Sequence, residues 1–266
     1  MNRPHPPIVG VFDSGVGGLS ILTALRRTIN ACRFVYVCDQ EFFPYGLQSE
    51  EELTRRVEQL CQQVLAQFPL DYVVIACNTA STVVLPRLRG QLQQAVIGVV
   101  PAIKPAAQLS RSKVIGLLAT PGTIERAYTQ ELIALHASNC TVLKLGSTRL
   151  VELAEAKLRG ELISSEEIAT ILRPLSQDPL LDTLVLGCTH FPHLLEELQA
   201  AFPRPITMVE PSEAIARRLL TLMEGASHIS LAEHEARDED ILYVTGPPLP
   251  ASLIQAFNLG ILFRKK

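Results

Sequence analysis

Two short segments of this chain have nearly the same pattern, and this internal similarity constrains the fold more than any other feature. The segments are residues 73–79 (VVIACNT) and residues 184–190 (LVLGCTH). Each is an apolar run followed by a small residue, a cysteine and hydrogen-bonding side chains. Such a run is typical of a buried parallel strand whose carboxyl end opens into a ligand site. The pattern predicts two equivalent strands that each end in a cysteine.

Three further pairs of apolar segments support an internal duplication. Residues 8–14 resemble residues 114–120, residues 34–37 resemble 142–145, and residues 97–100 resemble 206–209. All the pairs are separated by nearly the same number of residues, so a repeat explains them more economically than chance. The sequence therefore predicts two similar halves, in which Cys77 and Cys188 occupy matching positions.

Amphipathic segments lie between the predicted strands. Ser49 and Glu52 form a capping box ahead of an apolar face that continues to Phe68. Other helices are expected at residues 19–25, after each cysteine segment, at 123–136, 164–175 and 211–223, and after a last strand at 241–244. Alternating strands and helices are typical of parallel sheets. The expected fold class is α/β, with two similar lobes, each a largely parallel sheet flanked by helices, and the active site in the cleft between them.

Charge and hydropathy exclude several classes of function. The chain has 266 residues, a formal net charge of -3 and a pI near 6.1, so its electrostatics give no reason to expect a nucleic-acid partner. No apolar run reaches the length of a membrane span, and residues 1–7 lack the apolar segment of a secretion signal. We expect a cytoplasmic protein without a membrane partner. The polar stretch 225–240 is expected to be a surface excursion.

The cysteines are expected to be reduced thiols. They include no CxxC pair and no Cys/His spacing that is typical of a zinc site, so no metal is expected. Reduced thiols fit a cytosolic protein better than a disulfide framework does. Four of them are interpreted as small buried side chains, namely Cys32, Cys38, Cys61 and Cys140.

Two thiols that face one ligand from opposite sides suit proton transfer at a carbon acid. A thiolate on one face removes a proton while a thiol on the other face delivers one, which inverts the carbon centre. An unperturbed thiol has a pKa of about 8.5, so both forms are accessible near neutral pH. Asn78, Thr79 and Thr189 would supply uncharged donors and acceptors for a carboxylate and an amine. Asp13 and His190 would give each thiol an ionisable neighbour.

Four motifs in order resemble those of the bacterial glutamate racemases, which make D-glutamate for peptidoglycan without a cofactor. The motifs are residues 12–20 (FDSGVGGLS), 44–46 (PYG), 76–81 (ACNTAS) and 186–192 (LGCTHFP). The resemblance extends from Ile8 to about Met223. It implies that Cys77 and Cys188 are the catalytic pair and that the partner is a small-molecule substrate, glutamate.

The resemblance also implies a set of substrate contacts and a chain path. The contacts would come from Asp13, Ser14, Tyr45, Gly46, Asn78, Thr79, Thr189 and His190, with Thr120 and Thr123 as additions. In the family the chain returns after the second lobe to complete the first. Residues 1–98 and 208–266 would then form the N-terminal lobe, and residues 99–207 the second lobe.

Three residues depart from the family pattern. Glu41 stands where the family usually has alanine, Gln48 where a basic residue is usual, and Glu210 where aspartate is commoner. None of them is one of the paired cysteines, so the expected reaction is unaffected. Loop conformation, regulation and subunit packing are left open.

Structural roles are alternatives for several of these residues. Asp13 or Ser14 would also suit a helix cap, His190 a cap or a surface position, and Tyr45 a packing position. Glu152 is interpreted as a helix-surface charge or as an electrostatic contributor to the site.

Other functions also remain open at this point. A non-catalytic two-lobed binding protein would share the fold, and an aspartate or hydantoin racemase would share the two-thiol chemistry. A pyridoxal-dependent racemase would need a lysine signature, and none stands out. The sequence does not decide the oligomeric state, and a homodimer is one option.

Overall fold

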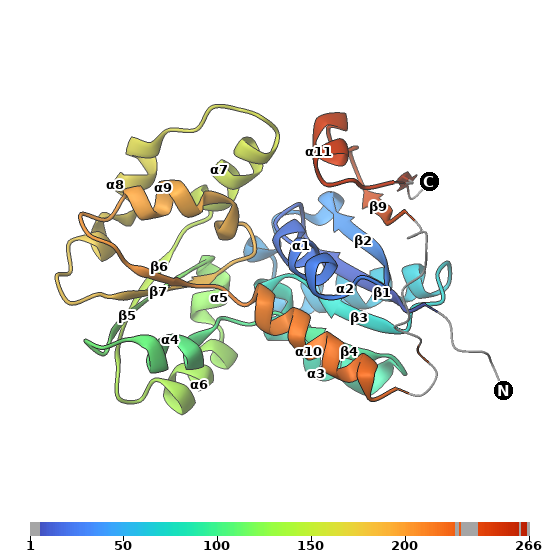
Figure 1. The fold of residues 1–266 in the computed structure, drawn as a ribbon, viewed down its shortest axis with the longest axis horizontal. Coiled ribbons are helices and arrows are strands. Elements are labelled where there is room, and N and C mark those ends of the chain that lie inside the picture. The colour runs from blue at the N-terminus through green and yellow to red at the C-terminus, as the bar shows by residue number, and fades with distance from the viewer. Residues whose placement is uncertain (1–5, 227–228, 230–238, 261, 265–266) are drawn as a thin grey trace. The chain divides into compact units, whose positions relative to one another are not determined.

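The computed structural model describes residues 6–226, 229, 239–260 and 262–264. The chain divides into two compact units, of which the first is Met1–Val99 with Ser212–Lys266 and the second is Val100–Pro211. Each unit contains one parallel sheet with helices packed against it (Figure 1). This confirms the expected fold class of two similar α/β lobes. Residues 1–5 and most of the polar stretch 225–240 lie outside the described residues.

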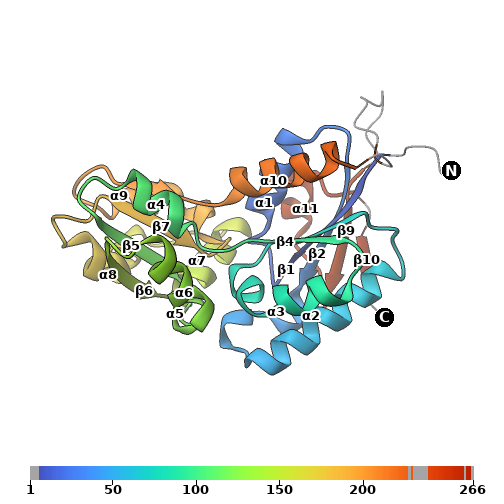
Figure 2. The ribbon, with the colours of Figure 1, turned by 90° about the horizontal axis from the view of Figure 1, so that it is seen from below.

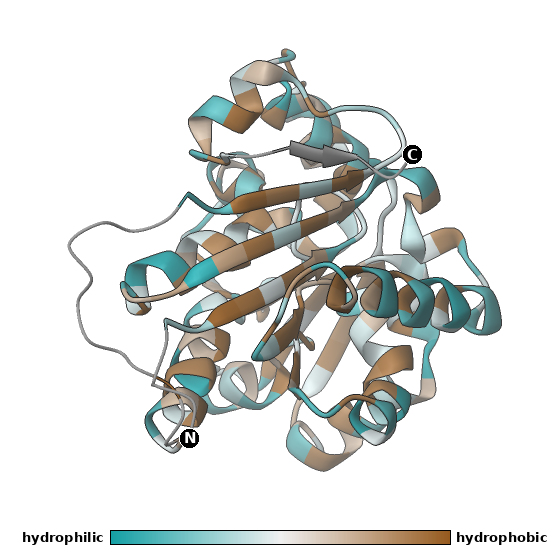
Figure 3. Ribbon diagram, turned by 90° about the vertical axis from the view of Figure 1, so that its right-hand side faces the viewer, coloured by the Kyte–Doolittle hydropathy of each residue, from teal (hydrophilic) through white to brown (hydrophobic). Residues whose placement is uncertain are grey.

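The first unit is built on a six-stranded parallel sheet with the strand order β10-β9-β2-β1-β3-β4. Its strands are β1 (Ile8–Asp13), β2 (Arg33–Asp39), β3 (Tyr72–Ile75), β4 (Ala95–Gly98), β9 (Ile241–Thr245) and β10 (Leu262–Arg264). The apolar strands in Figure 3 explain why the sheet needs cover on both faces. Helices α1 (Leu19–Thr28) and α10 (Ser212–Glu224) cover one face, and α2 (Glu50–Leu65) and α3 (Asn78–Gln91) cover the other (Figure 2).

Short elements connect these layers in the first unit. The 3₁₀ turns η1 (Gln40–Phe42) and η2 (Tyr45–Leu47) follow β2, and α11 (Ala251–Ala256) follows β9. The predicted start of α2 is confirmed, because the Ser49 hydroxyl caps the helix by accepting from the Glu52 amide. The Glu52 carboxylate accepts from the Ser49 hydroxyl at 2.6 Å. Helix α2 then buries its apolar face from Leu53 to Val64.

The second unit has a four-stranded parallel sheet with the order β6-β5-β7-β8. Its strands are β5 (Val114–Ala119), β6 (Thr141–Gly146), β7 (Thr183–Gly187) and β8 (Thr207–Val209). Figure 1 shows α7 (Arg149–Leu158), α8 (Ser165–Ser176) and α9 (Leu195–Ala200) over one face, and α4 (Ile103–Leu109) and α6 (Ala127–His136) over the other. The short α5 (Pro121–Glu125) and the 3₁₀ turn η3 (Phe191–Leu194) follow β5 and β7.

The predicted duplication is visible in the sheet order and in the strand register. The order β2-β1-β3-β4 of the first sheet recurs as β6-β5-β7-β8 in the second. Gly10 lies opposite Val73 and Val35, and its counterpart Gly116 lies opposite Leu184 and Leu143. The pairing of residues 97–100 with 206–209 was wrong, however. Ile97 lies opposite Val74 while Val209 lies opposite Val185, so Ile97 corresponds to Val209.

Two boundaries differ from those expected from the sequence. The helix predicted at residues 123–136 is two helices, because Arg126 adopts an extended backbone that ends α5 and begins α6. Strand β8 pairs with β7, so the second unit extends to Pro211, beyond Thr207, where the sequence analysis ended it. Among the described residues, none of the helices combines the length and the apolar character that a bilayer crossing would demand.

The Ser81 side chain links α3 to the end of β3 by a hydrogen bond. Its buried hydroxyl donates to the Ile75 carbonyl at 3.0 Å and accepts from the Val99 amide at 3.0 Å. Since Cys77 and Asn78 lie between β3 and this anchor, the bond helps to set where α3 begins.

We predict that Ser81→Ala lowers the free energy of unfolding by about 1 kcal/mol, the usual net contribution of a buried hydrogen bond of this kind. Urea unfolding followed by circular dichroism would measure the loss. Ser165→Ala, at an exposed position on α8, is the control and should leave the midpoint unchanged. Equal midpoints for the two variants would contradict the anchoring role.

Candidate active site

Cys77 lies directly after β3 and precedes the first residue of α3. Its side chain is 6% exposed and makes no capping bond to the helix. The Sγ atom lies 4.0 Å from the Oγ atom of Ser14, which follows the neighbouring strand β1. Parallel strands end at the same edge of a sheet, so the register of β1 against β3 brings the thiol and this hydroxyl together.

Asn78 occupies the first turn of α3 and has a side chain that suits a ligand. The residue is 2% exposed, yet neither its Oδ1 nor its Nδ2 atom has a hydrogen-bond partner among the described residues. A buried amide without a partner costs free energy unless something else satisfies it. A helix N-terminus also attracts negative charge through its unpaired N–H groups. Asn78 and the neighbouring buried Thr79 therefore lie beside Cys77 at this helix N-terminus, where the Asn78 amide still has unused donor and acceptor atoms.

Asp13 is buried at the end of β1, and its carboxylate shapes the following glycine turn. Its Oδ2 atom accepts from the Gly15 amide at 3.2 Å and from the Gly18 amide at 3.0 Å. A Cβ atom on Gly18 would lie 2.8 Å from the Asp13 Cβ, so only glycine fits there. Asp13 therefore binds backbone amides just before α1, close to the capping role that the sequence allowed. These bonds also fix the position of Ser14 beside Cys77.

Tyr45 is buried in η2, and Gly46 beside it is partly buried. The Tyr45 hydroxyl donates to Asp39 Oδ2 at 2.7 Å. Burial, the Asp39 carboxylate and, to a lesser degree, the charges of Cys77 and Asp13 raise the pKa of Tyr45 well above its ordinary value. Tyr45 is therefore a neutral phenol in the electrostatic environment of the Cys77 thiol.

Cys188 follows β7 in the second unit as Cys77 follows β3 in the first. It is 7% exposed, and Thr189 and His190 after it are also buried. The Cys188 Sγ atom lies 3.8 Å from His190 Nδ1. His190 is therefore a neighbour of the thiol and not the surface residue that the sequence allowed.

Glu155 on α7 is a functional candidate that the sequence analysis missed. Its buried carboxylate lies 2.8 Å from His190 Nε2 and also accepts from Arg159 at 3.1 Å. Glu152, which was considered instead, is a surface charge paired with Arg149. A carboxylate one helical turn further along the same helix was visible in the sequence, but no local pattern marks it as the residue that reaches His190.

Cys188 and Glu155 favour the protonated, charged form of His190. Burial lowers the pKa of His190, but the hydrogen bonds and charges of Cys188 and Glu155 outweigh burial and raise this pKa well above its ordinary value. The imidazolium can then donate from Nδ1 to a Cys188 thiolate and from Nε2 to Glu155. This arrangement resembles the Cys–His pairs of other enzymes, in which an imidazole nitrogen faces the sulfur.

Thr120 and Thr123 lie at the start of α5, after β5. The Thr120 hydroxyl accepts from the Thr123 amide at 3.2 Å, and the two hydroxyls lie 2.9 Å apart. Ala119 is the register partner of Gly187, so Thr120 and Cys188 are the next residues on neighbouring strands. Thr120 therefore holds the position next to Cys188 that Ser14 holds next to Cys77.

The other four cysteines lie outside the paired strand ends of β3 and β7. None of the six cysteines forms a disulfide. Cys38 donates to the Gly15 carbonyl at 3.0 Å, and Cys32 is buried. Burial, followed by the charge of Glu58, raises the pKa of the Cys61 thiol far above its ordinary value. Cys140 is partly exposed in the second unit. In the part of the chain that the structure describes, no three His, Cys, Asp or Glu side chains are grouped to hold a metal ion.

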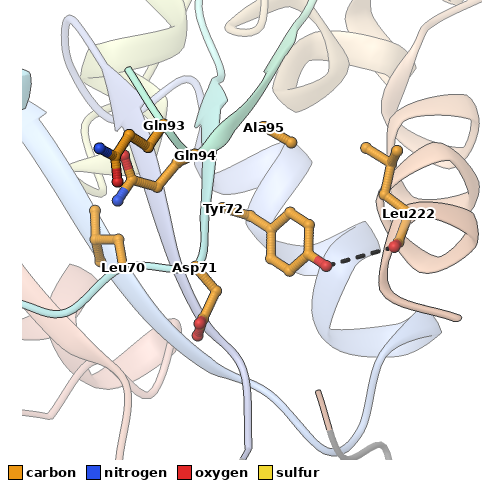
Figure 4. A pocket seen from close by; sticks show the side chains of 7 residues that line it. All are labelled: Leu70, Asp71, Tyr72, Gln93, Gln94, Ala95 and Leu222. Atoms are coloured by element: carbon orange, nitrogen blue, oxygen red, sulfur yellow. Dashed lines mark hydrogen bonds between the residues drawn. The ribbon is translucent and has the colours of Figure 1, made fainter. Parts of the chain in front are cut away.

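A surface hollow of about 400 Å³ lies away from these residues (Figure 4). It is lined by Leu70, Asp71, Tyr72, Gln93, Gln94, Ala95 and Leu222, and Tyr72 donates to the Leu222 carbonyl at its rim. Apart from Leu222 on α10, these residues lie at the amino ends of β3 and β4, whereas Cys77 lies after the carboxyl end of β3. The hollow is therefore separate from the cysteine site.

The comparisons with known proteins match this arrangement. Residues 11–219 match the family model described as Asp/Glu/Hydantoin racemase. A glutamate racemase from Pasteurella multocida is 49% identical over 223 residues, which cover 84% of this chain and 83% of that protein. One from Klebsiella pneumoniae is 50% identical over 237 residues, which cover 88% and 80%.

A solved structure is similar over almost the whole chain. It is the Escherichia coli glutamate racemase in complex with L-glutamate and the activator UDP-MurNAc-ala. The two structures have a TM-score of 0.89 and 42% sequence identity, over 99% of this chain and 98% of that one.

We predict that Glu155→Gln lowers the pKa of His190, because the substitution removes one of the two negative partners that hold its proton. Wild-type His190 should remain protonated through neutral pH, whereas the variant should titrate closer to the ordinary value of about 6.5. NMR titration of the protein with ¹³C-labelled histidine would measure both. Glu152→Gln on the same helix is the matched control. An unchanged His190 titration in the Glu155 variant would contradict the assigned pair.

Proposed function

We propose that this chain, which belongs to the Asp/Glu/Hydantoin racemase family, interconverts L-glutamate and D-glutamate by proton transfer through two thiols and without a cofactor. The enzyme class is an isomerase, as it is for the glutamate racemases that cover most of the chain. The observation that carries the proposal is the repeated strand end. Cys77 and Cys188 follow equivalent strands, and each has a hydroxyl-bearing residue at the end of the next strand.

In the proposed reaction each thiol works on one face of the substrate α-carbon. One of them, as a thiolate, takes the α-proton, and the other, as a thiol, delivers a proton to the opposite face. The resulting centre has the inverted configuration, and the reverse reaction exchanges the two roles. Both sulfur atoms must approach the carbon to about 3 to 3.5 Å, as in other near-attack geometries.

Different groups are proposed to stabilise negative charge on the two sulfur atoms. The His190 imidazolium, held by Glu155, stabilises negative charge on Cys188. Cys77 has the Ser14 hydroxyl and the N-terminus of α3, both of which favour a thiolate without adding a full charge. A reversible reaction of this kind requires that either thiol can lose its proton while its partner keeps one.

Uncharged donors are proposed to bind the substrate. Asn78 and Thr79 at the start of α3 would hold one carboxylate, which satisfies the otherwise unpartnered Asn78 amide. Thr120, Thr123 and Thr189 would complete the contacts from the second unit, and Asp13, Ser14, Tyr45, Gly46 and His190 those nearest the thiols. Glutamate is favoured over aspartate because the relatives that share most of the chain are glutamate racemases.

The setting of the reaction follows from the same proposal. All six cysteines are free thiols, which fits a reducing cytoplasm, where D-glutamate would be supplied for peptidoglycan. The proposed partner is the small-molecule substrate. We also propose that both units, residues 1–99 with 212–266 and residues 100–211, contribute substrate contacts. A homodimer is the assembly to test first by sedimentation.

The substrate assignment predicts that the purified protein abolishes the circular dichroism of a D-glutamate solution, with no cofactor added. D-aspartate should react far more slowly, because its second carboxylate is one methylene closer to the α-carbon and leaves polar groups of the site unpaired. Equal kcat/KM values for the two amino acids would overturn glutamate but not the reaction type. No change in either solution would support a non-catalytic binding protein.

The two-thiol mechanism predicts that Cys77→Ser and Cys188→Ser each reduce turnover in both directions by roughly 10²- to 10⁴-fold, the usual contribution of a positioned acid or base. A serine hydroxyl is hardly ionised at neutral pH and cannot replace a thiolate. Steady-state assays from both enantiomers would measure the loss. Cys140→Ser is the matched control in the second unit and should keep full activity.

Solvent deuterium distinguishes two thiols from a single base that reaches both faces. In D₂O the first-formed product enantiomer should carry deuterium at its α-carbon, while the remaining substrate enantiomer stays largely protiated. Retention of the substrate hydrogen in early product would contradict the two-thiol model, even if both cysteines were essential.

A further inference from the structure

Asp39, the last residue of β2, is fully buried and accepts hydrogen bonds from three side chains. Its Oδ2 atom accepts from Tyr45 at 2.7 Å and from Arg56 Nε at 2.8 Å. Its Oδ1 atom accepts from Arg56 Nη2 and from the Thr245 hydroxyl. Three side chains therefore share one carboxylate.

The donors to Asp39 come from elements that are far apart in the sequence. Tyr45 belongs to η2, Arg56 to α2 and Thr245 to the end of β9. The Thr245 hydroxyl also accepts from the Glu41 amide of η1 at 3.3 Å. Asp39 thus connects the segment from η1 to η2 with the helix and the strand that lie on either side of it.

The backbone of η1 is closely packed against the residue that follows β9. Gly246 follows β9 with a φ of +73°, and a Cβ atom there would lie 2.9 Å from the Glu41 backbone nitrogen. The backbone of η1 therefore lies directly against the end of β9. A buried carboxylate that loses a partner is costly, so the bonds to Asp39 tend to be kept or lost together.

The position of the segment matters because Tyr45 and Gly46 are among the proposed substrate contacts. Tyr45 donates its hydroxyl proton to Asp39, so this proton is already used within the protein. The charges of Cys77 and Asp13 also contribute to the raised pKa of Tyr45, which places the phenol in the surroundings of the thiol. The positions at which Tyr45 and Gly46 can contact a substrate therefore depend on the hydrogen bonds that Asp39 makes.

We infer that Asp39 is a positioning residue for the reaction, which fixes the Tyr45–Gly46 segment for substrate binding through the Tyr45 hydroxyl and the Arg56 guanidinium. The inference rests on the proposed function, which assigns substrate contacts to this segment. Asp39 acts through Tyr45 and takes no part in proton transfer itself. Its effect therefore lies mainly in the binding of glutamate.

Glu41 adds a second carboxylate to Arg56 but is not essential to this arrangement. Its Oε2 atom lies 2.8 Å from Arg56 Nη2, and its side chain is 53% exposed. Ion pairs at such exposed positions contribute little because solvent screens them. Arg56 also lies over the Phe42 ring, 5.8 Å from its centroid. The alanine that the family usually has at the position of Glu41 would therefore leave the Asp39 bonds intact.

The inference predicts that Asp39→Asn lowers kcat/KM for D-glutamate by about 10- to 100-fold, a typical effect of a misplaced binding segment, with most of the change in KM. Tyr45→Phe should cause a smaller loss. If Asp39 acts through Tyr45, the double variant should be no worse than Asp39→Asn alone. Multiplied losses in the double variant would overturn the inference. Should Asp39→Asn fail to fold, Arg56→Lys replaces it in the same cycle.

Hydrogen exchange gives a second readout that does not depend on glutamate. The amides of residues 40–48 should exchange at least tenfold faster in Asp39→Asn than in the wild type, because an exchange rate reports local opening. Asp182→Asn is the control, since Asp182 accepts from the Arg111 and Ser112 amides at 2.8 Å, far along the sequence and in the other unit. It should change neither KM nor exchange in residues 40–48.

These two measurements separate the inference from the proposed function. If the wild type does not racemise glutamate, the proposed function fails, and exchange in residues 40–48 alone decides whether Asp39 fixes the segment. If the wild type is active but Asp39→Asn behaves like Asp182→Asn in both measurements, the inference fails and the proposed function stands.

Discussion

The register between neighbouring parallel strands is the constraint on which the candidate site depends. β1 against β3 and β5 against β7 have equivalent register, so the residues after each pair lie at matching positions. Ser14 follows β1 and lies beside Cys77, and Thr120 follows β5 as Cys188 follows β7. A shift of one residue in either pair would turn the cysteine to the other face of its sheet. The buried apolar strands make such a shift costly, and this fixes both thiols.

The two strand ends are alike in backbone and different in charge. Cys188 has a protonated His190 that is held by Glu155, whereas the Ser14 hydroxyl and the Asn78 amide are among the polar groups beside Cys77. In the proposed reaction both thiols exchange protons with the same carbon, so each needs a neighbour that tolerates negative charge on its sulfur. The helix N-terminus at Asn78 supplies partial positive charge in the first unit where an imidazolium supplies it in the second.

Much of this could be predicted from the sequence because the relevant signals are local. Apolar runs followed by polar residues marked β3 and β7 and the side chains after them, and Ser49 with Glu52 marked the start of α2. Contacts between residues that are far apart in the sequence left no such local signal. Glu155 reaches His190 from a separate helix, and nothing in the helix distinguishes it from Glu152. The break at Arg126 has neither glycine nor proline at that residue, and short apolar strands such as β8 can be aligned in more than one register.

Each unit has a buried carboxylate that holds a residue near its cysteine, but the two carboxylates occupy different positions in the repeat. In each, a buried carboxylate binds one arginine and one residue near a cysteine: Asp39 binds Arg56 and Tyr45, and Glu155 binds Arg159 and His190. The positions are not equivalent in the repeat, since Asp39 ends β2, whose counterpart β6 leads to Ser147, a residue that accepts from the Leu150 amide. Duplication therefore explains the shared strand ends but not the carboxylates. A residue near a thiol must keep one orientation while the thiol gains and loses charge, and a buried carboxylate with a second donor is a physical way to hold it.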